Sequence, residues 1–254
     1  MIDIHCHILP GIDDGPQHFH ESIEMAKAAV EEGITHLFAT PHHLNGQYEN
    51  VKSDILNYVL SLNQHLQSEK IPITIHSGQE IRIHRELLFS LANDEILTLD
   101  NRQEYLLLEL PSGEVPKYTL EMVYELKLRG LTPIIVHPER NRGFIENPLL
   151  LFEIIQEGGL TQLTAGSVSG HFGKKIKSFS ETMIEHHLAH FIASDSHFTR
   201  LRGFFFQKAY DTITKRFGIQ HTFYFKENAQ LLLSGQHPHI EKPLPIRKKI
   251  LGVF

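Results

Sequence analysis

The sequence predicts an α/β protein whose parallel strands form a closed or nearly closed barrel. Seven short β-rich apolar runs alternate with helix-length segments along the 254 residues, an order produced by parallel strands joined by right-handed crossovers. About 250 residues is also an ordinary length for one barrel. The competing architecture is an open doubly wound sheet, but no glycine-rich phosphate-binding motif follows any strand. We therefore expect one domain over residues 1–254, with about 236–254 as a C-terminal tail.

The individual elements follow from local patterns along the chain. We expect strands at residues 2–5, 35–40, 73–77, 104–109, 133–137, 161–165 and 190–194. We expect helices in the segments 22–33, 118–130, 148–159, 173–188 and 206–218. In the first of these helices apolar residues recur at helical spacing and Gly33 is a natural stop, as Gly130 is for the second.

Composition excludes several classes of protein. Hydrophobic residues make up 41% and charged residues 21% of the chain, with a formal net charge of -6, so a disordered protein is not expected. No apolar run reaches the roughly 18 residues of a membrane-spanning helix, and the N-terminus has no signal-peptide pattern. We expect a cytoplasmic protein without membrane insertion and, given its acidity, without a nucleic-acid partner. A single cysteine, Cys6, excludes a disulfide framework and a zinc site of cysteine pairs.

The stretch IDIHCHILPGIDDG carries the first functional signal. Side chains of a strand alternate with period two, so His5 and His7 share one face while Cys6 points to the other. Asp13 and Asp14 follow in the loop beyond. A surface strand can carry two histidines without a chemical role, so the motif alone does not establish a metal site.

The ends of the other strands strengthen the metal interpretation. Barrels of this kind place their working residues at the C-terminal ends of the strands. Six of the seven strand ends carry residues that bind metals: His5 and His7, His42 and His43, Glu80, Glu109, His137, and Asp195 with His197. Imidazole and carboxylate without thiolate suit Mn²⁺, Fe²⁺ or Zn²⁺. Seven or more ligands exceed what one ion uses, so we expect two or three ions.

Taken together, these motifs resemble a known superfamily. HCH with the downstream DDG, TPHH, GQE, HPER and SDSH are similar to the motifs of the polymerase-and-histidinol-phosphatase (PHP) metal-dependent phosphoesterases. More closely, IDIHCHILPGIDDGP, ATPHH, SGQEIR, LLLELP, PIIVHPERN and IASDSH resemble the manganese-dependent bacterial protein-tyrosine phosphatases of the CpsB/YwqE type, encoded with capsule and exopolysaccharide genes. The similarity runs from residue 2 to about residue 235.

The resemblance implies a distorted (β/α)₇ barrel, the PHP fold, with a trinuclear Mn²⁺ site at the C-terminal ends of the strands. The implied ligands are His5, His7, Glu80 and Asp195 for one ion, Glu80, Glu109 and His137 for a second, and Asp14, His42 and His197 for the third. Whether Asp13 or Asp14 is the ligand is open, and the family pattern favours Asp14. His43 and His171 lie near the expected site without an expected role.

The implied reaction is hydrolysis of phosphotyrosine by an acidified water molecule. A phenolate leaves easily, because its conjugate acid has a pKa of about 10. We expect His137 and Arg140 of HPER to be catalytic, with Arg140 clamping the phosphate through its planar guanidinium. A structural ion pair is the alternative role of Arg140. Arg82 and Arg142 are weaker candidates of the same kind.

The implied partner is the phosphotyrosine tail of a bacterial tyrosine kinase that regulates capsular or exopolysaccharide synthesis. One alternative is a phosphatase of a small ester such as histidinol phosphate, and another is a non-catalytic metal-binding assembly protein. A nuclease of the same superfamily is disfavoured by the lack of a basic groove pattern. The helix at 19–32 could form an oligomer contact, or it could pack on its own barrel.

Overall fold

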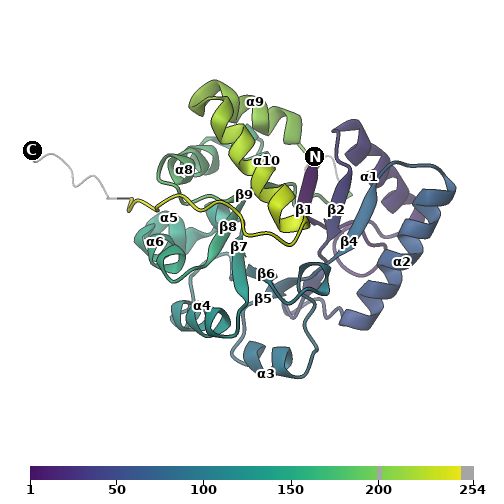
Figure 1. Ribbon diagram of the computed structural model, residues 1–254, viewed down its shortest axis with the longest axis horizontal. Helices are drawn as coiled ribbons and strands as arrows, with labels where there is room; N and C mark the ends of the chain where they lie inside the picture. Colours follow the sequence, from purple (N-terminus) through teal and green to yellow (C-terminus); the bar gives the residue numbers. More distant parts are fainter. Residues whose placement is uncertain (199–201, 247–254) are drawn as a thin grey trace, which may run out of the picture.

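The computed structural model describes residues 1–198 and 202–246, and it places parallel strands at the centre with helices around them (Figure 1). The strands are β1 (Ile2–Cys6), β2 (His36–Ala39), β3 (His42–His43), β4 (Thr74–Ser77), β5 (Glu80–Arg82), β6 (Tyr105–Glu109), β7 (Thr132–Val136), β8 (Leu160–Thr164) and β9 (Phe191–Ala193). The helices are α1 (Phe19–Glu31), α2 (Lys52–Ser68), α3 (Leu87–Ala92), α4 (Thr119–Leu128), α5 (Arg142–Glu146), α6 (Leu149–Gln156), α7 (Ala165–Ser169), α8 (Lys174–Glu185), α9 (Phe206–Phe217) and α10 (Ile219–Leu233), with 3₁₀ turns η1 (Leu99–Asn101) and η2 (Pro138–Arg140). Each of the seven predicted strands is present within a few residues of its expected position.

The strands form two parallel sheets, with the orders β1-β2-β4 and β3-β5-β6-β7-β8-β9. The predicted strands at 35–40 and 73–77 each continue into a second strand that belongs to the other sheet. The interruptions fall at residues 40–41 and 78–79, where Pro41 and Gly78 occur. Proline lacks the N–H that a ladder needs, and glycine has no side chain to pack, so both residues are typical of strand breaks.

The α/β class with parallel strands is confirmed, but the predicted closure into a barrel is not. Between the last strand and the first, the ladder is reduced to one isolated bridge, Cys6 to Ser196. The backbone turns sharply at Asp195, which has a φ of 50°. Among the described residues, two backbone hydrogen bonds flank the bridge, from the N–H of Asp195 to the oxygen of His5 and from that of His7 to the oxygen of Ser196. Strands β9 and β1 thus share this bridge in place of a continuous ladder.

The strands separate two groups of buried apolar side chains. Ile4, Phe38 and Leu107 belong to an inner group that the strands enclose. Leu37 and Leu108 point the other way and pack with the surrounding helices. This alternation follows from the period of two along a strand.

The first strand departs from regular alternation in a way that serves the site. Its register against β2 shifts between Asp3 and Cys6. Such a bulge re-aims the side chains that follow it. As a result Ile4 packs in the inner group, Cys6 packs on the helix side, and His5 and His7 both reach the common site.

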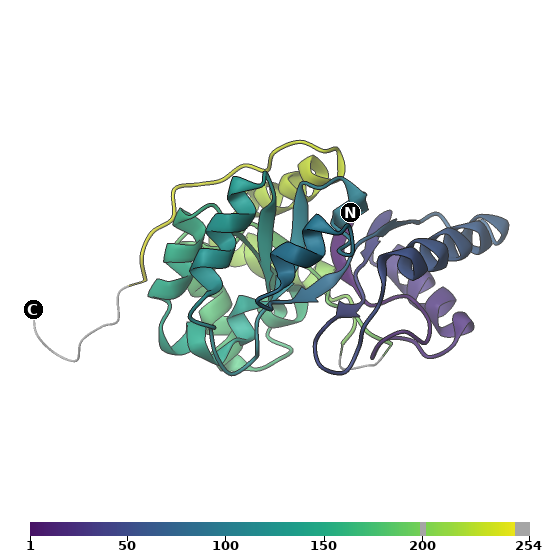
Figure 2. The same cartoon turned by 90° about the horizontal axis from the view of Figure 1, so that it is seen from below.

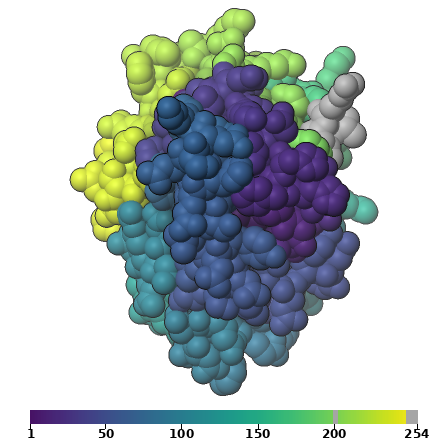
Figure 3. Space-filling model, turned by 90° about the vertical axis from the view of Figure 1, so that its right-hand side faces the viewer, coloured from purple at the N-terminus to yellow at the C-terminus, as the bar shows by residue number. Residues whose placement is uncertain are grey.

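Helices α1 and α2 cover the three-stranded sheet on one side of the molecule (Figure 2), and the N-terminal part of the chain forms much of the face seen in Figure 3. The segment at 236–246 runs along the surface of the molecule, on the side opposite the loop that follows β9 (Figure 2). Two hydrogen bonds anchor this segment: the N–H of Leu244 donates to the oxygen of His186, and that of His239 donates to Oδ1 of Asn228. The remainder of the predicted tail lies outside the described residues. Within the described parts of the chain, no helix has the length and apolarity needed to cross a membrane.

Candidate metal centre

The two histidines of the first strand point their Nε2 atoms at each other, 3.2 Å apart. Their other ring nitrogens are held by buried acceptors. The Nδ1 of His5 lies 3.0 Å from Oε1 of Gln162, and that of His7 lies 2.6 Å from Oδ2 of Asp13. Partners of this kind fix ring orientation and tautomer in metal-binding histidines.

The adjacent residues Asp13 and Asp14 have different positions. Asp13 is buried, and besides His7 it accepts hydrogen bonds from the backbone N–H groups of Gly15 and His42. Asp14 is more exposed and its Oδ1 lies 2.9 Å from Nε2 of His197 and 3.5 Å from Nε2 of His42. Asp13 therefore orients a histidine, whereas Asp14 faces the open space of the cluster.

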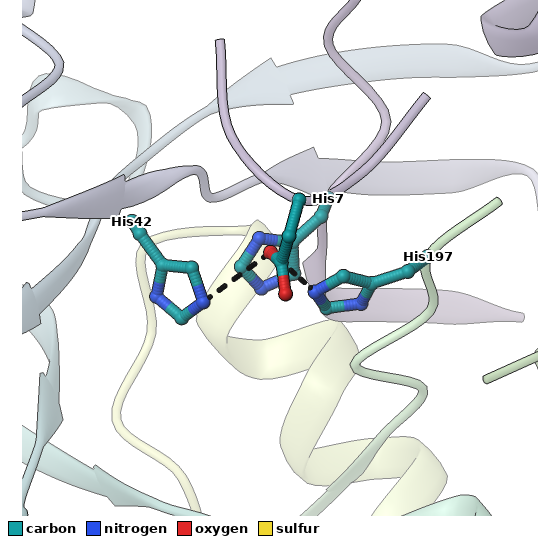
Figure 4. Close-up of side chains that lie close together, drawn as sticks. His7, His42 and His197 are labelled. Carbon is teal, nitrogen blue, oxygen red and sulfur yellow. Dashed lines mark hydrogen bonds and ion pairs between the residues drawn. The ribbon is translucent and has the colours of Figure 1, made fainter. Parts of the chain in front are cut away.

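Three imidazoles converge on this open space (Figure 4). Atoms of His7, Asp14, His42 and His197 that could each bind a metal all lie within 4.8 Å of one another. The rings of His7 and His197 are stacked with centroids 4.0 Å apart. The residues come from the end of β1, from β3 and from the segment after β9, so the site joins both sheets.

Glu80 lies at the centre of two further groups. His5, His7 and Glu80 form one, and His42, Glu80 and Glu109 form the other. His137 is close as well, with Nε2 2.7 Å from Oε1 of Glu80. His42 therefore lies close both to Asp14 and to the pair of Glu80 and Glu109.

Asp195 and His137 occupy strained backbone positions at the same end of the sheets. Their φ angles are 50° and 37°, a left-handed region that costs free energy for residues with a side chain. Oδ1 of Asp195 lies 3.6 Å from Nε2 of His5 and 3.4 Å from that of His7. The structure thus brings all nine predicted ligands to one end of the strands.

Among the described residues, two arginines border the cluster on the side of its cavity, and of these Arg140 was predicted. Arg140 donates to Oδ2 of Asp195. Arg202, which sequence reasoning missed, lies 2.9 Å from the same oxygen and 3.4 Å from Asp14. The sequence feature that could have indicated Arg202 is its position in the loop after the last strand, seven residues after Asp195. Both arginines line a cavity of about 370 Å³ together with His42, Glu109 and His137.

The other candidates take lesser positions. Arg82 pairs with Oε2 of Glu109 at 3.0 Å, beside the cluster. Arg142 is exposed and pairs with Glu146 at 2.7 Å. His43 is buried outside the metal-binding groups, and His171 is exposed.

The charges of the cluster are strongly coupled. Burial, and then the Glu80 carboxylate, raise the pKa of Glu109 to about 7. Burial also lowers the pKa of His137 to about 4, assisted by the positive charge of Arg140. Against the effect of burial, Arg140 and Arg202 hold the pKa of Asp195 well below its usual range. Against the effect of burial, Asp13 holds the pKa of His7 well above its usual value, and Glu80 raises that of His42. The carboxylates of the cluster thus attract positive charge, and cations that bind there would compete with protons for the same side chains.

The donor set fits divalent cations. Nδ1 of His42 and Oε2 of Glu80 are buried 2.7 Å apart without hydrogen-bonding geometry, and Oε2 of Glu109 is also buried without a hydrogen bond. Two neighbouring ligands of an octahedral ion, each at about 2.1 Å from it, stand about 3 Å apart. The separations of 3.2 Å between His5 and His7 and 2.7 Å between His42 and Glu80 are close to that value.

Comparison with known proteins gives full-length relatives. The family model described as "Capsular polysaccharide synthesis, CpsB/CapC" matches residues 1–234. The chain is 45% identical over 255 residues to Tyrosine-protein phosphatase YwqE of Bacillus subtilis (strain 168), covering 100% of both chains. It is 30% identical over 225 residues to Tyrosine-protein phosphatase CpsB of Streptococcus pneumoniae, covering 87% of this chain and 92% of that one.

Solved structures agree with the sequence comparison. A chain from the crystal structures of YwqE from Bacillus subtilis and CpsB from Streptococcus pneumoniae, described as unique metal-dependent tyrosine phosphatases, aligns with a TM-score of 0.95 at 44% identity, over 98% of this chain and 100% of that one. Histidinol phosphate phosphatase from Lactococcus lactis aligns with a TM-score of 0.54 at 15% identity, over 85% and 94% of the two chains. This second similarity shows a shared fold alone.

Proposed function

Because the chain belongs to the CpsB/CapC family of capsular polysaccharide synthesis, we propose that it is a metal-dependent tyrosine-protein phosphatase acting in that process. The observation that carries the proposal is the convergence of nine imidazole and carboxylate side chains beside a cavity that two arginines border. A phosphate monoester carries the charge that such a site neutralises.

We propose two or three divalent cations, with Mn²⁺ as the physiological ion. One set of ligands is His5, His7, Glu80 and Asp195, a second is Glu80, Glu109 and His137, and a third is Asp14, His42 and His197. The close approach of His7 to Asp14 and of His42 to Glu80 supports sharing of ligands between ions. Fe²⁺ and Zn²⁺ suit the same donor types.

Individual residues of the chain have distinct roles beside those of the cations. When bound, the cations lower the pKa of a water molecule and offset the charge of the phosphoryl group. Arg140 and Arg202 face the cavity and bind phosphoryl oxygens through paired N–H groups. Gln162 and Asp13 keep His5 and His7 in the required orientation. His137, whose Nε2 lies 2.7 Å from Oε1 of Glu80, would hold a cation together with Glu80 and Glu109.

We further propose the architecture and partner that this function needs. If β2–β3 and β4–β5 each count as one strand, seven β-units form one distorted (β/α)₇ barrel in a single domain over residues 1–254, and the Cys6–Ser196 bridge supports that closure. The substrate is the phosphotyrosine tail of a tyrosine kinase. Because such a kinase uses ATP, the tail and this chain would meet in the cytoplasm.

The decisive experiment compares three substrates. Metal-stripped protein is titrated with Mn²⁺ and assayed with a phosphotyrosine peptide, a phosphoserine peptide and histidinol phosphate, with His137→Ala as the control variant. We expect Mn²⁺-restored, phosphotyrosine-selective turnover that the variant lacks. Preference for histidinol phosphate would replace the proposed substrate, and bound metal without any turnover would refute the phosphatase proposal.

A further inference from the structure

The cavity beside the cluster is lined by both ionisable and apolar residues. The ionisable residues are His42, Glu109, His137 and the two arginines. The apolar residues are Leu110, Ile135, Val136, Phe144 and Phe172. The first four are buried, whereas Phe172 is only partly buried. Phe172 therefore offers the cavity an aromatic surface that other core residues do not already cover.

The ring of Phe172 is held in place by its surroundings. The turn that carries it lies between Gly170 and Gly173, whose φ angles of 85° and 97° suit glycine. Its ring packs directly on the backbone of α7, because a Cβ added at Gly166 would stand 2.9 Å from Cε2 of Phe172. The absence of a side chain at Gly166 thus sets how far the ring lies from the cavity.

Phe172 also lies beside the predicted phosphate clamp. The guanidinium carbon of Arg140 stands 5.7 Å from the centroid of the Phe172 ring. A guanidinium within about 6 Å of a ring centroid contacts the aromatic face. Because Arg140 contacts Phe172, an ester whose phosphoryl group binds Arg140 would have its leaving group close to Phe172.

We propose that Phe172 is a specificity-determining residue that packs against the phenyl ring of phosphotyrosine. This inference rests on the proposed phosphatase function and deepens it, because it names the group that distinguishes an aryl ester from an alkyl ester. The cations and arginines bind the phosphoryl group, which both kinds of ester share. Phe172 contacts the part in which they differ.

The test compares binding of phenylphosphonate and methylphosphonate to the Mn²⁺-loaded protein by calorimetry. Both probes carry the same head group and neither is hydrolysed, so differences in leaving-group reactivity do not enter. We expect the wild-type protein to prefer phenylphosphonate by about tenfold, the size of one favourable aromatic contact. Phe172→Ala should remove most of this preference and leave the affinity for methylphosphonate unchanged.

Two further variants guard against a folding defect. Phe172→Tyr keeps the ring and should keep the preference. Gly166→Ala keeps Phe172 but pushes its ring away from α7, so it should alter the preference without removing an aromatic group. Phe223→Ala, which removes an exposed phenylalanine of α10 that does not line the cavity, is the matched control.

The outcomes separate this inference from the proposed function. A preference that survives in Phe172→Ala would overturn the inference. An equal loss for both phosphonates would also overturn it, since Phe172 would then only position Arg140. If the preference depends on Phe172 but phosphotyrosine peptides are not hydrolysed, the aryl-binding role stands and the phosphatase proposal fails.

Discussion

Asp13 and Asp14 show how a difference of one residue changes the role of a carboxylate. Asp13 is buried and its oxygens are occupied by His7 and by two backbone N–H groups. Asp14 points its Oδ1 between His42 and His197. The loop geometry decides which one faces the open space of the cluster, because the two side chains leave the backbone in different directions.

These roles predict different metal-binding defects. Asp13→Asn should weaken Mn²⁺ affinity by about 10–100-fold with the stoichiometry unchanged, because it alters the partner of a ligand. Asp14→Asn should lower the number of bound ions by one, because it removes a ligand. Titration calorimetry and metal analysis of dialysed protein measure both. An ion lost in Asp13→Asn and retained in Asp14→Asn would reverse the two assignments.

A prediction for Arg140 belongs to the same scale. Arg140→Gln should lower kcat/KM for a phosphotyrosine peptide about 100-fold with metal content unchanged, because a charge-assisted contact to phosphate is lost. The kcat/KM of Arg140→Lys should lie between those of the wild type and Arg140→Gln, because lysine keeps the charge without the planar guanidinium. Arg142→Gln, at an exposed arginine paired with Glu146, is the matched control. Loss of metal or of folding alone in Arg140→Gln would make Arg140 a structural partner of Asp195.

At the scale of elements, the interrupted strands position the cluster. Gly78 separates β4 from β5, and a Cβ there would stand 2.8 Å from Cδ2 of Leu99 and 3.0 Å from Cγ2 of Thr40. Glu80 begins the strand that follows. The close packing at Gly78 thus fixes where the central carboxylate of the site emerges.

Substituting this glycine should therefore affect both stability and metal binding. We expect Gly78→Ala to lower the free energy of unfolding by about 1–3 kcal/mol through overpacking, and to weaken Mn²⁺ binding by displacing Glu80. Urea denaturation and calorimetry give the two quantities. At Gly113 an added Cβ meets nothing within 4 Å, so Gly113→Ala should change neither. Equal changes in unfolding free energy and in Mn²⁺ affinity in the two variants would contradict the role given to Gly78.

A second prediction at this scale concerns His190, which lies fully buried just before β9. Its Nδ1 lies 3.1 Å from the backbone nitrogen of Thr161, and burial lowers its pKa from 6.5 to about 3. The unfolded chain therefore binds a proton that the folded chain does not. The stability that depends on a neutral His190 is fully present above pH 6.5 and is lost as the pH falls toward 3.

Between pH 6.5 and 5 this loss should amount to about 2 kcal/mol. His190→Asn retains an acceptor for Thr161 and does not titrate, so its stability should fall less over this range. Urea unfolding midpoints at several pH values measure the difference, with His20→Asn on an exposed histidine as control. Parallel pH dependence of wild type and His190→Asn would show that His190 is not the titrating group.

The accuracy of the sequence-based predictions varied by element for physical reasons. The strands were found because each is a short apolar run bounded by polar residues. Helix α10 was not predicted because its buried face includes the polar residues Thr222 and Asn228, the latter bonded to the oxygen of His190. Arg202 was missed because its contact with Asp195 depends on how the last loop folds back. The strand breaks at Pro41 and Gly78 were visible in the sequence but were not interpreted.

At the scale of the whole molecule, the cluster connects two sheets whose ladders are separate. Ligand-type residues come from β1 and β3, from β5 and β6, and from the segments that follow β7 and β9. Five carboxylates, Asp13, Asp14, Glu80, Glu109 and Asp195, crowd together there. Bound cations would thus offset repulsion and hold both sheets in place.

Metal binding should therefore stabilise the fold as a whole. Mn²⁺ at 100 times its Kd should add about 2.7 kcal/mol per independent site, raising Tm by several degrees for a chain of this size. Differential scanning calorimetry with and without a chelator measures the shift. Glu80→Gln should show a smaller shift than wild type. An unchanged Tm on metal removal would mean that the sheets keep their arrangement without cations.

The anchoring of residues 236–246 has a practical consequence. Asn228 and His186 hold this segment, and Tyr105, at the start of β6, approaches His237. The segment therefore lies near the ends where strands begin, while the cavity opens where they finish. A fusion partner or surface linker attached through this segment would extend from the side of the molecule opposite the mouth of the cavity. Protein immobilised in that way should keep its site open to large phosphorylated substrates.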